Sequence, residues 1–319
     1  MVTNNAMRDV TDVDRGPGGG SVPDVEHPPG HVDGRLFSQA EHPTVLRTDF
    51  DVPEYLAGAR GRIPVTIDSV DLAEDTARDL SFLWRLENSA LAETRAVLAS
   101  WTANEARITA FITAWGYERY WLARALRDLL EAAPTSSLPR PRPTLTMRLR
   151  GSWVERGLPI LAPVVGGIVK EPLTAGHMAR LAIQEGALQV AENALLPRLQ
   201  GEAASVLSEV VKRRDEIIRF FRTEAIARIT RSRREAVTAR LHLARPWAPL
   251  RVVGVPDPDE ARALTSIFAA GADRRGLIES DANIGRYVPL TSKPSVNQIR
   301  AALGTNRRTD ARTRRENGV

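Results

Sequence analysis

Cysteine is absent from this 319-residue chain and histidine is scarce, which narrows the chemistry that the chain can support. Without cysteine there is no disulfide, no thiolate metal site and no cysteine nucleophile. The five histidines are His27, His31, His42, His177 and His242. None of them stands beside the glutamates considered below, so imidazole ligands and a Ser/His/Asp triad are both disfavoured.

Long hydrophobic runs are also lacking. The longest, at residues 157–169, is interrupted by Pro159 and Pro163 and is too short to span a bilayer. The N-terminus has no charged segment followed by an apolar one, which disfavours a secretory signal. We therefore expect a cytoplasmic protein without a membrane span, and its 43% hydrophobic content is enough to bury a core.

The basic residues are almost all arginine. Of the 44 basic residues only Lys170, Lys212 and Lys293 are lysine, which leaves 41 arginines, and the net charge is +5. This bias first indicates a GC-rich coding sequence. The arginines crowd residues 212–251 and 300–315, and a basic surface favours an acidic partner such as nucleic acid, anionic lipid or an acidic carrier protein.

Composition and periodicity divide the chain into three parts. Residues 1–40 are rich in Gly and Pro and are expected to be disordered, and residues 291–319 are expected to form a basic, flexible tail. Between them, residues 41–290 are predicted to form one helical domain. Apolar residues recur there at three- and four-residue steps in segments 71–101, 105–131, 177–196, 202–239 and 259–270.

The first four helical segments form two hairpins, separated by a proline run at 139–143 and an irregular connection at 144–173. Two helix pairs joined by one long crossover are typical of ferritin-like bundles. The predicted fold class is therefore all-α, a ferritin-like four-helix bundle with extra helices and disordered termini.

Charged residues interrupt the apolar stripes of these helices. Glu87, Glu118 and Glu185 are in phase with the apolar residues of the first three helices, and Arg214 is in phase on the fourth. Glu216 follows Glu185 by 31 residues, just as Glu118 follows Glu87. Buried carboxylates are costly unless they are paired or hold a metal, so the four glutamates are a candidate metal site. A single glutamate on such a stripe is as readily a boundary residue that extends into solvent.

Four short stretches resemble the bacterial acyl-carrier-protein desaturases of the ferritin-like superfamily. They are Leu86-Glu87-Asn-Ser-Ala-Leu, Trp115-Gly-Tyr-Glu118-Arg119-Tyr-Trp121-Leu122, Ala182-Ile-Gln-Glu185 and Ile217-Ile-Arg-Phe-Phe-Arg222. The resemblance covers about residues 80–240. It implies a ferritin-like fold and a di-iron site in which each half supplies one Glu and then a Glu-x-x-His on the next helix.

The second helix departs from the family pattern at the histidine. Glu118 keeps a carboxylate, but Trp121 stands at the histidine position. If the alignment slips by one residue, the pair becomes Arg119 and Leu122. Either alignment removes the imidazole.

The fourth helix departs as well. Spacing selects Glu216 with Arg219 in place of histidine, whereas motif text and helical phase select Arg214 and Ile217. Phase is preferred because Glu216 lies off the main stripe. Without either histidine the site is expected to bind metal poorly. We hypothesise that Arg214 reaches into the bundle and neutralises the surviving carboxylates through its planar fork.

These features lead to one functional prediction and two alternatives. The chain is expected to have lost di-iron chemistry, to need no cofactor, and to act as a binding or accessory subunit in a homodimer or heterodimer. Its partner would be an acyl chain, an active desaturase, or an acyl carrier protein that docks on a basic patch. The patch is predicted at Arg228, Arg231, Arg233 and Arg234.

The first alternative is an active, iron-dependent acyl desaturase or oxygenase that uses Glu87, Glu118, Glu185 and Glu216 as a carboxylate-rich site. The second is nucleic-acid binding through the arginine-rich face. It is disfavoured because the sequence has no recognised binding motif and no interleaved aromatic platform.

Overall fold

The computed structural model describes residues 46–66, 70–133, 172–245, 247–252, 255, 257–288 and 293–316. Every regular element in these ranges is a helix and none is a strand, which confirms the all-α class. The segment predicted to be disordered, 1–40, and nearly all of the connection at 144–173 lie outside the described residues. No helix within these ranges is both long and apolar enough to cross a membrane.

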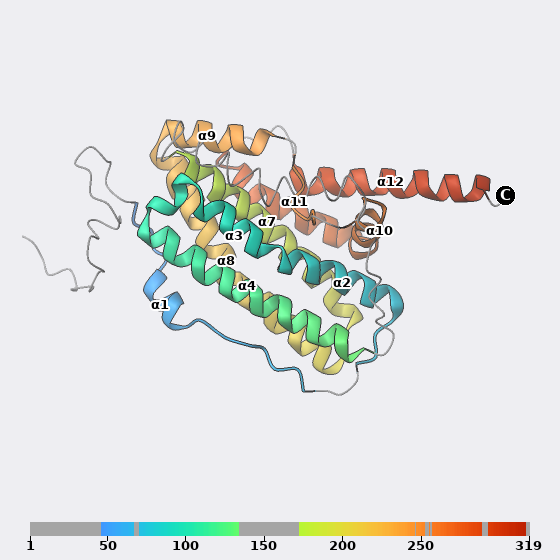
Figure 1. The fold of residues 1–319 in the computed structure, drawn as a ribbon. Coiled ribbons are helices and arrows are strands. Elements are labelled where there is room, and N and C mark those ends of the chain that lie inside the picture. Colours follow the sequence, from blue (N-terminus) through green and yellow to red (C-terminus); the bar gives the residue numbers. More distant parts are fainter. Residues whose placement is uncertain are drawn as a thin grey trace, which may run out of the picture.

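The described residues form ten α-helices and two short 3-10 helices (Figure 1). In chain order they are α1 (Val52–Ala57), α2 (Glu74–Asn88), α3 (Ala90–Leu98), η1 (Trp101–Asn104), α4 (Ala106–Ala132), α7 (Leu173–Leu195), η3 (Leu196–Arg198), α8 (Gly201–Arg231), α9 (Arg233–Ala244), α10 (Asp257–Ile267), α11 (Gly271–Gly285) and α12 (Pro294–Glu316).

Two of the predicted long helices are broken at a serine. The first divides into α2 and α3 at Ser89, whose hydroxyl donates a 2.7 Å hydrogen bond to the carbonyl of Leu86. A serine hydroxyl that bonds to nearby backbone competes with the helical pattern. The fourth predicted helix ends at Arg231, because Ser232 is extended (φ −142°, ψ 129°), and α9 follows as a separate helix.

The tail predicted to be flexible forms α12 instead. Ile299 and Ala302 are buried in the apolar core, and α12 packs against α10 and α11 before it extends past the body of the molecule (Figure 1). The expectation of a flexible segment from 291 onward is therefore wrong for the first turns of α12. Two apolar residues at helical spacing were enough to dock this otherwise polar segment.

The four long helices pack in a ring. α2 packs against α4 and α7, and α8 packs against the same two helices. The apolar core between them consists of two clusters. The first core cluster includes Leu83, Leu126, Leu188 and Leu207, and the second core cluster includes Phe111, Trp115, Met178 and Phe221.

The order of these clusters along the chain gives the helix directions. In α8, and along α2 into α3, first-cluster residues precede second-cluster residues; in α4 and α7 they follow them. Neighbouring helices in the ring are therefore antiparallel. The two helices that the residues after 133 connect, α4 and α7, run parallel. The four long helices thus form two antiparallel pairs, α2 with α4 and α7 with α8.

Helix α7 lies at the centre of the molecule and contacts α2, α8, α9 and α11. It is accordingly buried on nearly all sides. Two glycines allow the close approach of its neighbours. A Cβ at Gly176 would lie 2.9 Å from the Cβ of His242 on α9, and a Cβ at Gly186 would collide with Ser280 on α11.

Candidate functional site

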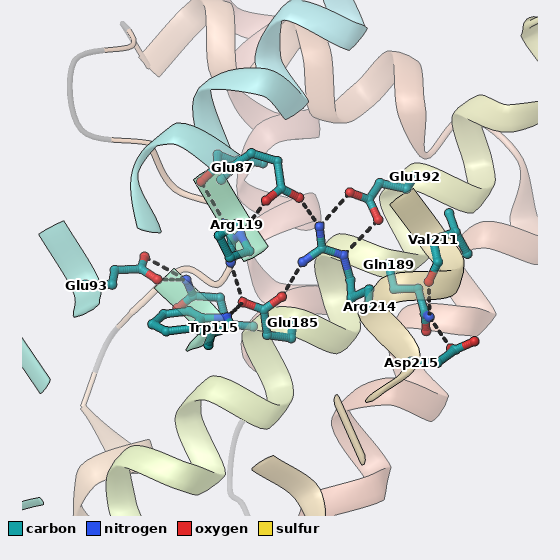
Figure 2. A network of polar contacts seen from close by, with 12 residues as sticks. Glu87, Glu93, Trp115, Arg119, Glu185, Gln189, Glu192, Val211, Arg214 and Asp215 are labelled. Carbon is teal, nitrogen blue, oxygen red and sulfur yellow. Dashed lines mark hydrogen bonds and ion pairs between the residues drawn. The ribbon is translucent and has the colours of Figure 1, made fainter. Parts of the chain in front are cut away.

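A layer of buried charge lies between the two core clusters (Figure 2). Glu87 comes from the end of α2, Arg119 from the middle of α4, Glu185 and Glu192 from α7, and Arg214 from the middle of α8. All five residues are 1% exposed or less. Each helix of the ring therefore changes from apolar to charged and back to apolar at the same level of the bundle.

Two arginines and two glutamates in this layer alternate around a closed ring of ion pairs. Arg119 donates through Nε to Glu87 and through Nη1 to Glu185. Arg214 donates through Nη2 to the other oxygen of Glu87 and through Nη1 to the other oxygen of Glu185. Trp115 adds a 3.0 Å hydrogen bond from Nε1 to Glu185. Each carboxylate thus bridges two cations, and each cation contacts both carboxylates.

The two arginines differ in their remaining partners. Arg214 donates from Nε and Nη2 to the two oxygens of Glu192, at 2.8 Å each, in a bidentate pair. Arg119 instead donates from Nη2 to the carbonyl of Leu86 at 2.9 Å. Bidentate arginine–carboxylate pairs are strong and geometrically specific, so Glu192 holds Arg214 in one orientation.

The layer contains three carboxylates and two guanidiniums, so fully ionised it carries one negative charge. Burial raises the pKa of Glu192 well above its usual range, and the neighbouring charge of Glu185 raises it further. Burial also raises the pKa of Glu185 itself. Burial lowers the pKa of Arg214 to about 9, which still leaves the guanidinium charged at neutral pH. The positive charge of Arg119 acts in the opposite direction and lowers the pKa of both Glu185 and Glu192.

The structure brings together three of the charged residues that the sequence placed on apolar stripes, namely Glu87, Glu185 and Arg214. Arg214 reaches into the bundle and pairs with Glu87 and Glu185, as its helical phase suggested. Glu192 was not predicted. It follows Glu185 by seven residues, two helical turns along the same face, and this spacing was the signal that could have identified it.

The other two predicted glutamates lie outside the layer. Glu118 accepts a 2.6 Å hydrogen bond from the backbone N–H of Arg60 and lies 3.7 Å from Arg213. Burial raises the pKa of Glu118. Glu216 is on the surface and pairs with Arg219 at 2.5 Å. The four glutamates of the predicted carboxylate-rich site are therefore not assembled, because Glu118 is buried against Arg60 and Arg213 instead of the layer and Glu216 lies at the surface.

The positions expected to replace the histidines differ in whether their side chains face the interior. In α4, Arg119 and Leu122 are buried, whereas Trp121 is only partly buried. In α8, Arg214 and Ile217 are both fully buried, as helical phase predicted. Each half of the bundle thus presents the same pattern, an arginine followed three residues later by an aliphatic residue.

The charge layer does not suit a di-iron centre. Both oxygens of Glu87 and Glu185 already accept from guanidinium nitrogens, and both histidines that the structure describes, His177 and His242, lie together between α7 and α9. Within the described ranges there is no group of three or more His, Cys, Asp or Glu side chains that could hold a metal ion.

Arg228 belongs to a second buried network and not to the surface. It is fully buried and donates to both oxygens of Glu105, at 2.9 and 2.6 Å. Glu224 lies 3.3 Å and Glu235 3.8 Å from its guanidinium. Its place in the predicted basic patch is therefore wrong. Arg228 follows Arg214 by 14 residues, about four helical turns, and so faces the interior as Arg214 does.

The remaining residues of the predicted patch are near the surface but are not equivalent. Arg231 pairs with Glu235, at 2.7 Å, across the break between α8 and α9. Arg233 and Arg234 are exposed at the start of α9. Only these two remain as candidates for a docking patch from the predicted set.

A groove of about 520 Å³ follows one face of α8. Ile218, Arg219, Arg222 and Ile226 are among its lining residues. The guanidinium of Arg219 lies 4.9 Å over the ring of Phe50 and is held by this contact and by Glu216. The groove therefore offers apolar surface beside two arginines and the carboxylate of Asp215.

No protein-family model, curated protein or solved structure matches this chain. Its relationship to any family therefore depends on the short stretches quoted above and on the arrangement of the charge layer.

Proposed function

We propose that this chain is a ferritin-like relative of the acyl-carrier-protein desaturases in which two guanidiniums replace a di-iron centre. It acts as a binding or accessory subunit and not as a redox enzyme. The observation that carries this proposal is the ring of ion pairs, in which Glu87 and Glu185 each bridge Arg119 and Arg214. Carboxylates that bridge two cations inside a four-helix bundle are the central feature of di-iron sites.

The two halves of the bundle support the same proposal. The hairpin of α2 and α4 supplies Glu87 and then Arg119-x-x-Leu122, and the hairpin of α7 and α8 supplies Glu185 and then Arg214-x-x-Ile217. The resembled family uses a Glu and then a Glu-x-x-His in each half. The first glutamate of each half is retained, while the second is replaced by a cation and the histidine by an aliphatic side chain.

The helix directions are a further support. Two antiparallel hairpins with a long crossover between parallel helices are the connectivity of ferritin-like bundles. Here the crossover joins α4 to α7, and the layer of charge crosses all four helices at one level.

The chemistry of the layer favours a structural role for the former site. A catalytic metal needs an open coordination position for oxygen or substrate. In this layer the carboxylate oxygens are occupied by guanidinium donors, and the aliphatic Leu122 and Ile217 offer no ligand. Function is then left to the outer surfaces, where an acyl chain, an acyl carrier protein or an active desaturase subunit would bind.

The groove along α8 supports an amphiphilic ligand or partner segment at one of these surfaces. Ile218 and Ile226 supply apolar contact, and Arg222 is exposed without an ion pair to any residue that the structure describes. Pockets that combine apolar walls with one or two charged groups orient ligands by the charged end. An acyl chain with an anionic head has this chemistry.

Metal content tests the proposal directly. The protein is produced in cells supplied with excess iron, and iron, manganese and zinc are measured per chain by elemental analysis. We expect no stoichiometric metal. We also expect a melting temperature that neither chelator nor added ferrous iron changes, because only a ligand of the native state raises it. Two metal ions per chain, or a dioxygen-dependent absorption band after iron loading, would contradict the proposal.

A further inference from the structure

Helix α9 has two apolar faces, and only one of them is packed. Ala239 and Leu243 are buried against the rest of the molecule. Val237 and Leu241, one turn apart, are 49% and 64% exposed, and Ala244 continues the same stripe. Among the large hydrophobic side chains of the described residues, Leu241 has the largest exposed fraction, and α9 lies at the margin of the molecule (Figure 1).

Exposed arginines flank this outer stripe on both sides. Arg233 and Arg240 are seven residues apart and lie along one edge, and Arg234 and Arg245 are eleven residues apart and lie along the other. None of the four has a hydrogen bond or ion pair to another residue that the structure describes.

The outer face of α9 also lacks any acidic residue. The only carboxylate of this helix, Glu235, is buried and already pairs with Arg231. The arginines along the two edges are therefore not neutralised within α9. The result is an apolar stripe of about two helical turns, from Val237 to Ala244, between two rows of positive charge.

We propose that this face of α9 docks an acidic, amphipathic helix of a partner protein. The apolar stripe of that helix packs on Val237 and Leu241, and its flanking carboxylates pair with Arg233, Arg240 and Arg234. When one helix binds to another, apolar side chains spaced by one helical turn form the main contacts. Val237 and Leu241 have this spacing. Charge complementarity at the two edges sets the register and speeds association.

The same observations disfavour the other occupants of an exposed helix face. A second copy of α9 would oppose arginine to arginine along both edges, and like charges across an interface are strongly unfavourable. A bilayer surface is matched by a wide apolar face with aromatic residues, whereas this stripe has two large aliphatic side chains. Nucleic acid would engage the arginines but would leave the apolar stripe without a partner.

This inference rests on the proposed accessory role, for which it names the chemistry of the partner. It concerns α9 and not the charge layer, so the two tests fail separately. Metal bound in the bundle would overturn the proposed function, and the docking experiment could still be interpreted. If docking fails, the metal analysis still tests the proposed function.

The test uses the full chain and a fluorescent peptide of about 18 residues, with a leucine stripe at helical spacing flanked by glutamates. Fluorescence anisotropy measures its binding. The comparison probes are a peptide of the same composition in scrambled order, vesicles of phosphatidylglycerol and phosphatidylcholine, and a short duplex DNA. We expect saturable binding of the amphipathic peptide, with weaker binding of the scrambled peptide, the vesicles and the DNA.

Substitutions separate the two parts of the face. Arg233→Glu with Arg240→Glu should weaken peptide binding by about tenfold or more, because it places like charges opposite each other. Leu241→Ser removes the apolar contact without any change of charge and should also weaken binding several-fold. The matched control is Arg275→Glu with Arg300→Glu, two exposed arginines away from α9, which has the same change in net charge. This control should leave the affinity nearly unchanged.

Several results would overturn the docking proposal. Equal affinity for the scrambled peptide would show that charge alone is read, and so would an unchanged affinity in Leu241→Ser. A preference for the vesicles or the DNA would assign the face to a different occupant. No binding of the amphipathic peptide would refute the proposal outright. Because the substituted side chains are exposed, circular dichroism and melting temperature should match those of the original chain in every variant.

Discussion

Replacement of Arg214 by methionine should destabilise the fold severely, because Arg214 is the cation that joins the three buried carboxylates. Its guanidinium donates to Glu87, Glu185 and Glu192, and none of the four side chains is exposed. Removing one partner of a buried ion pair costs about 3–5 kcal/mol, since the remaining charge is left without compensation in a medium that solvates it poorly.

This cost is large compared with the total stability of a typical domain. Domains of this kind have unfolding free energies of about 5–15 kcal/mol. Arg214→Met should therefore remove about a fifth or more of the stability, measured as the shift in the urea midpoint at constant slope. Arg214→Lys should cost less, because it keeps the charge but replaces the planar fork with a single ammonium.

Two comparison variants show whether the cost comes from unpaired charge. Arg219→Met removes a surface arginine that pairs with Glu216, and such a change should stay within about 0.5 kcal/mol. Replacing the whole layer by apolar residues of similar volume should cost far less than Arg214→Met alone, because buried ion networks exchange for packed hydrophobic residues at little net cost.

The pH dependence supplies a second signature of the same layer. Burial raises the pKa of Glu192 above its unfolded value, so the folded state holds a proton that the unfolded chain releases. Its contribution to stability is present below the unfolded pKa and is lost as pH rises through the folded one. In Arg214→Met the remaining buried carboxylates lose their cation, so their protonated forms are favoured more strongly in the folded state. The destabilisation caused by the substitution should therefore shrink on acidification from pH 8. A cost under about 1 kcal/mol at pH 8, equal to that of Arg219→Met, would refute the reasoning.

Three further perturbations have directions set by the structure. Arg228→Met should destabilise the fold by about 3 kcal/mol, because it leaves the carboxylate of Glu105 buried and unpaired. Urea titration measures this cost, and a value near zero would show that solvent reaches this network. Gly176→Ala should destabilise by about 1–3 kcal/mol through the close approach of His242 to α7, whereas Gly304→Ala, with open space at its Cβ, should stabilise slightly; equal melting temperatures would contradict this. Burial lowers the pKa of His177 to about 3 and that of His242 to about 4, so below about pH 6.5 the unfolded chain takes up protons that the folded state does not. The contribution of these histidines to the free energy of unfolding should therefore be lost as the pH falls below about 6.5. Replacement of His242 by phenylalanine should make the free energy of unfolding depend less on pH in that range.

Helical periodicity was sufficient to predict most of the bundle. The predicted helices at 105–131 and 177–196 correspond to α4 and α7 within a few residues. Their apolar residues repeat at three- and four-residue steps over many turns, which is the strongest signal that a single sequence contains. The break at Ser89 was not visible, because a serine within a helical pattern breaks it only when its hydroxyl finds a backbone carbonyl.

The candidate site was predicted in part. The in-phase positions of Glu87, Glu185 and Arg214 indicated that these three side chains share the interior. Helical phase selected Glu118, but the structure buries both Glu118 and its neighbour Arg119, whose directions differ by about 100° around the helix. Packing against α2 and α7 decided that Arg119, and not Glu118, contacts Glu87 and Glu185.

By itself the sequence determined the all-α class, the absence of thiol chemistry and the presence of charges on apolar stripes. These properties follow from residue type and from spacing along one helix. Only the tertiary structure decided how the charges are paired, that Arg228 is buried against Glu105, and that α12 docks on the core. Each of these depends on which residue of a distant helix lies opposite, and no local pattern contains that information. The physical reason is the cost of unpaired charge in the interior, which the fold lowers by ion pairs such as that of Arg214 with Glu87, 127 residues apart in the chain.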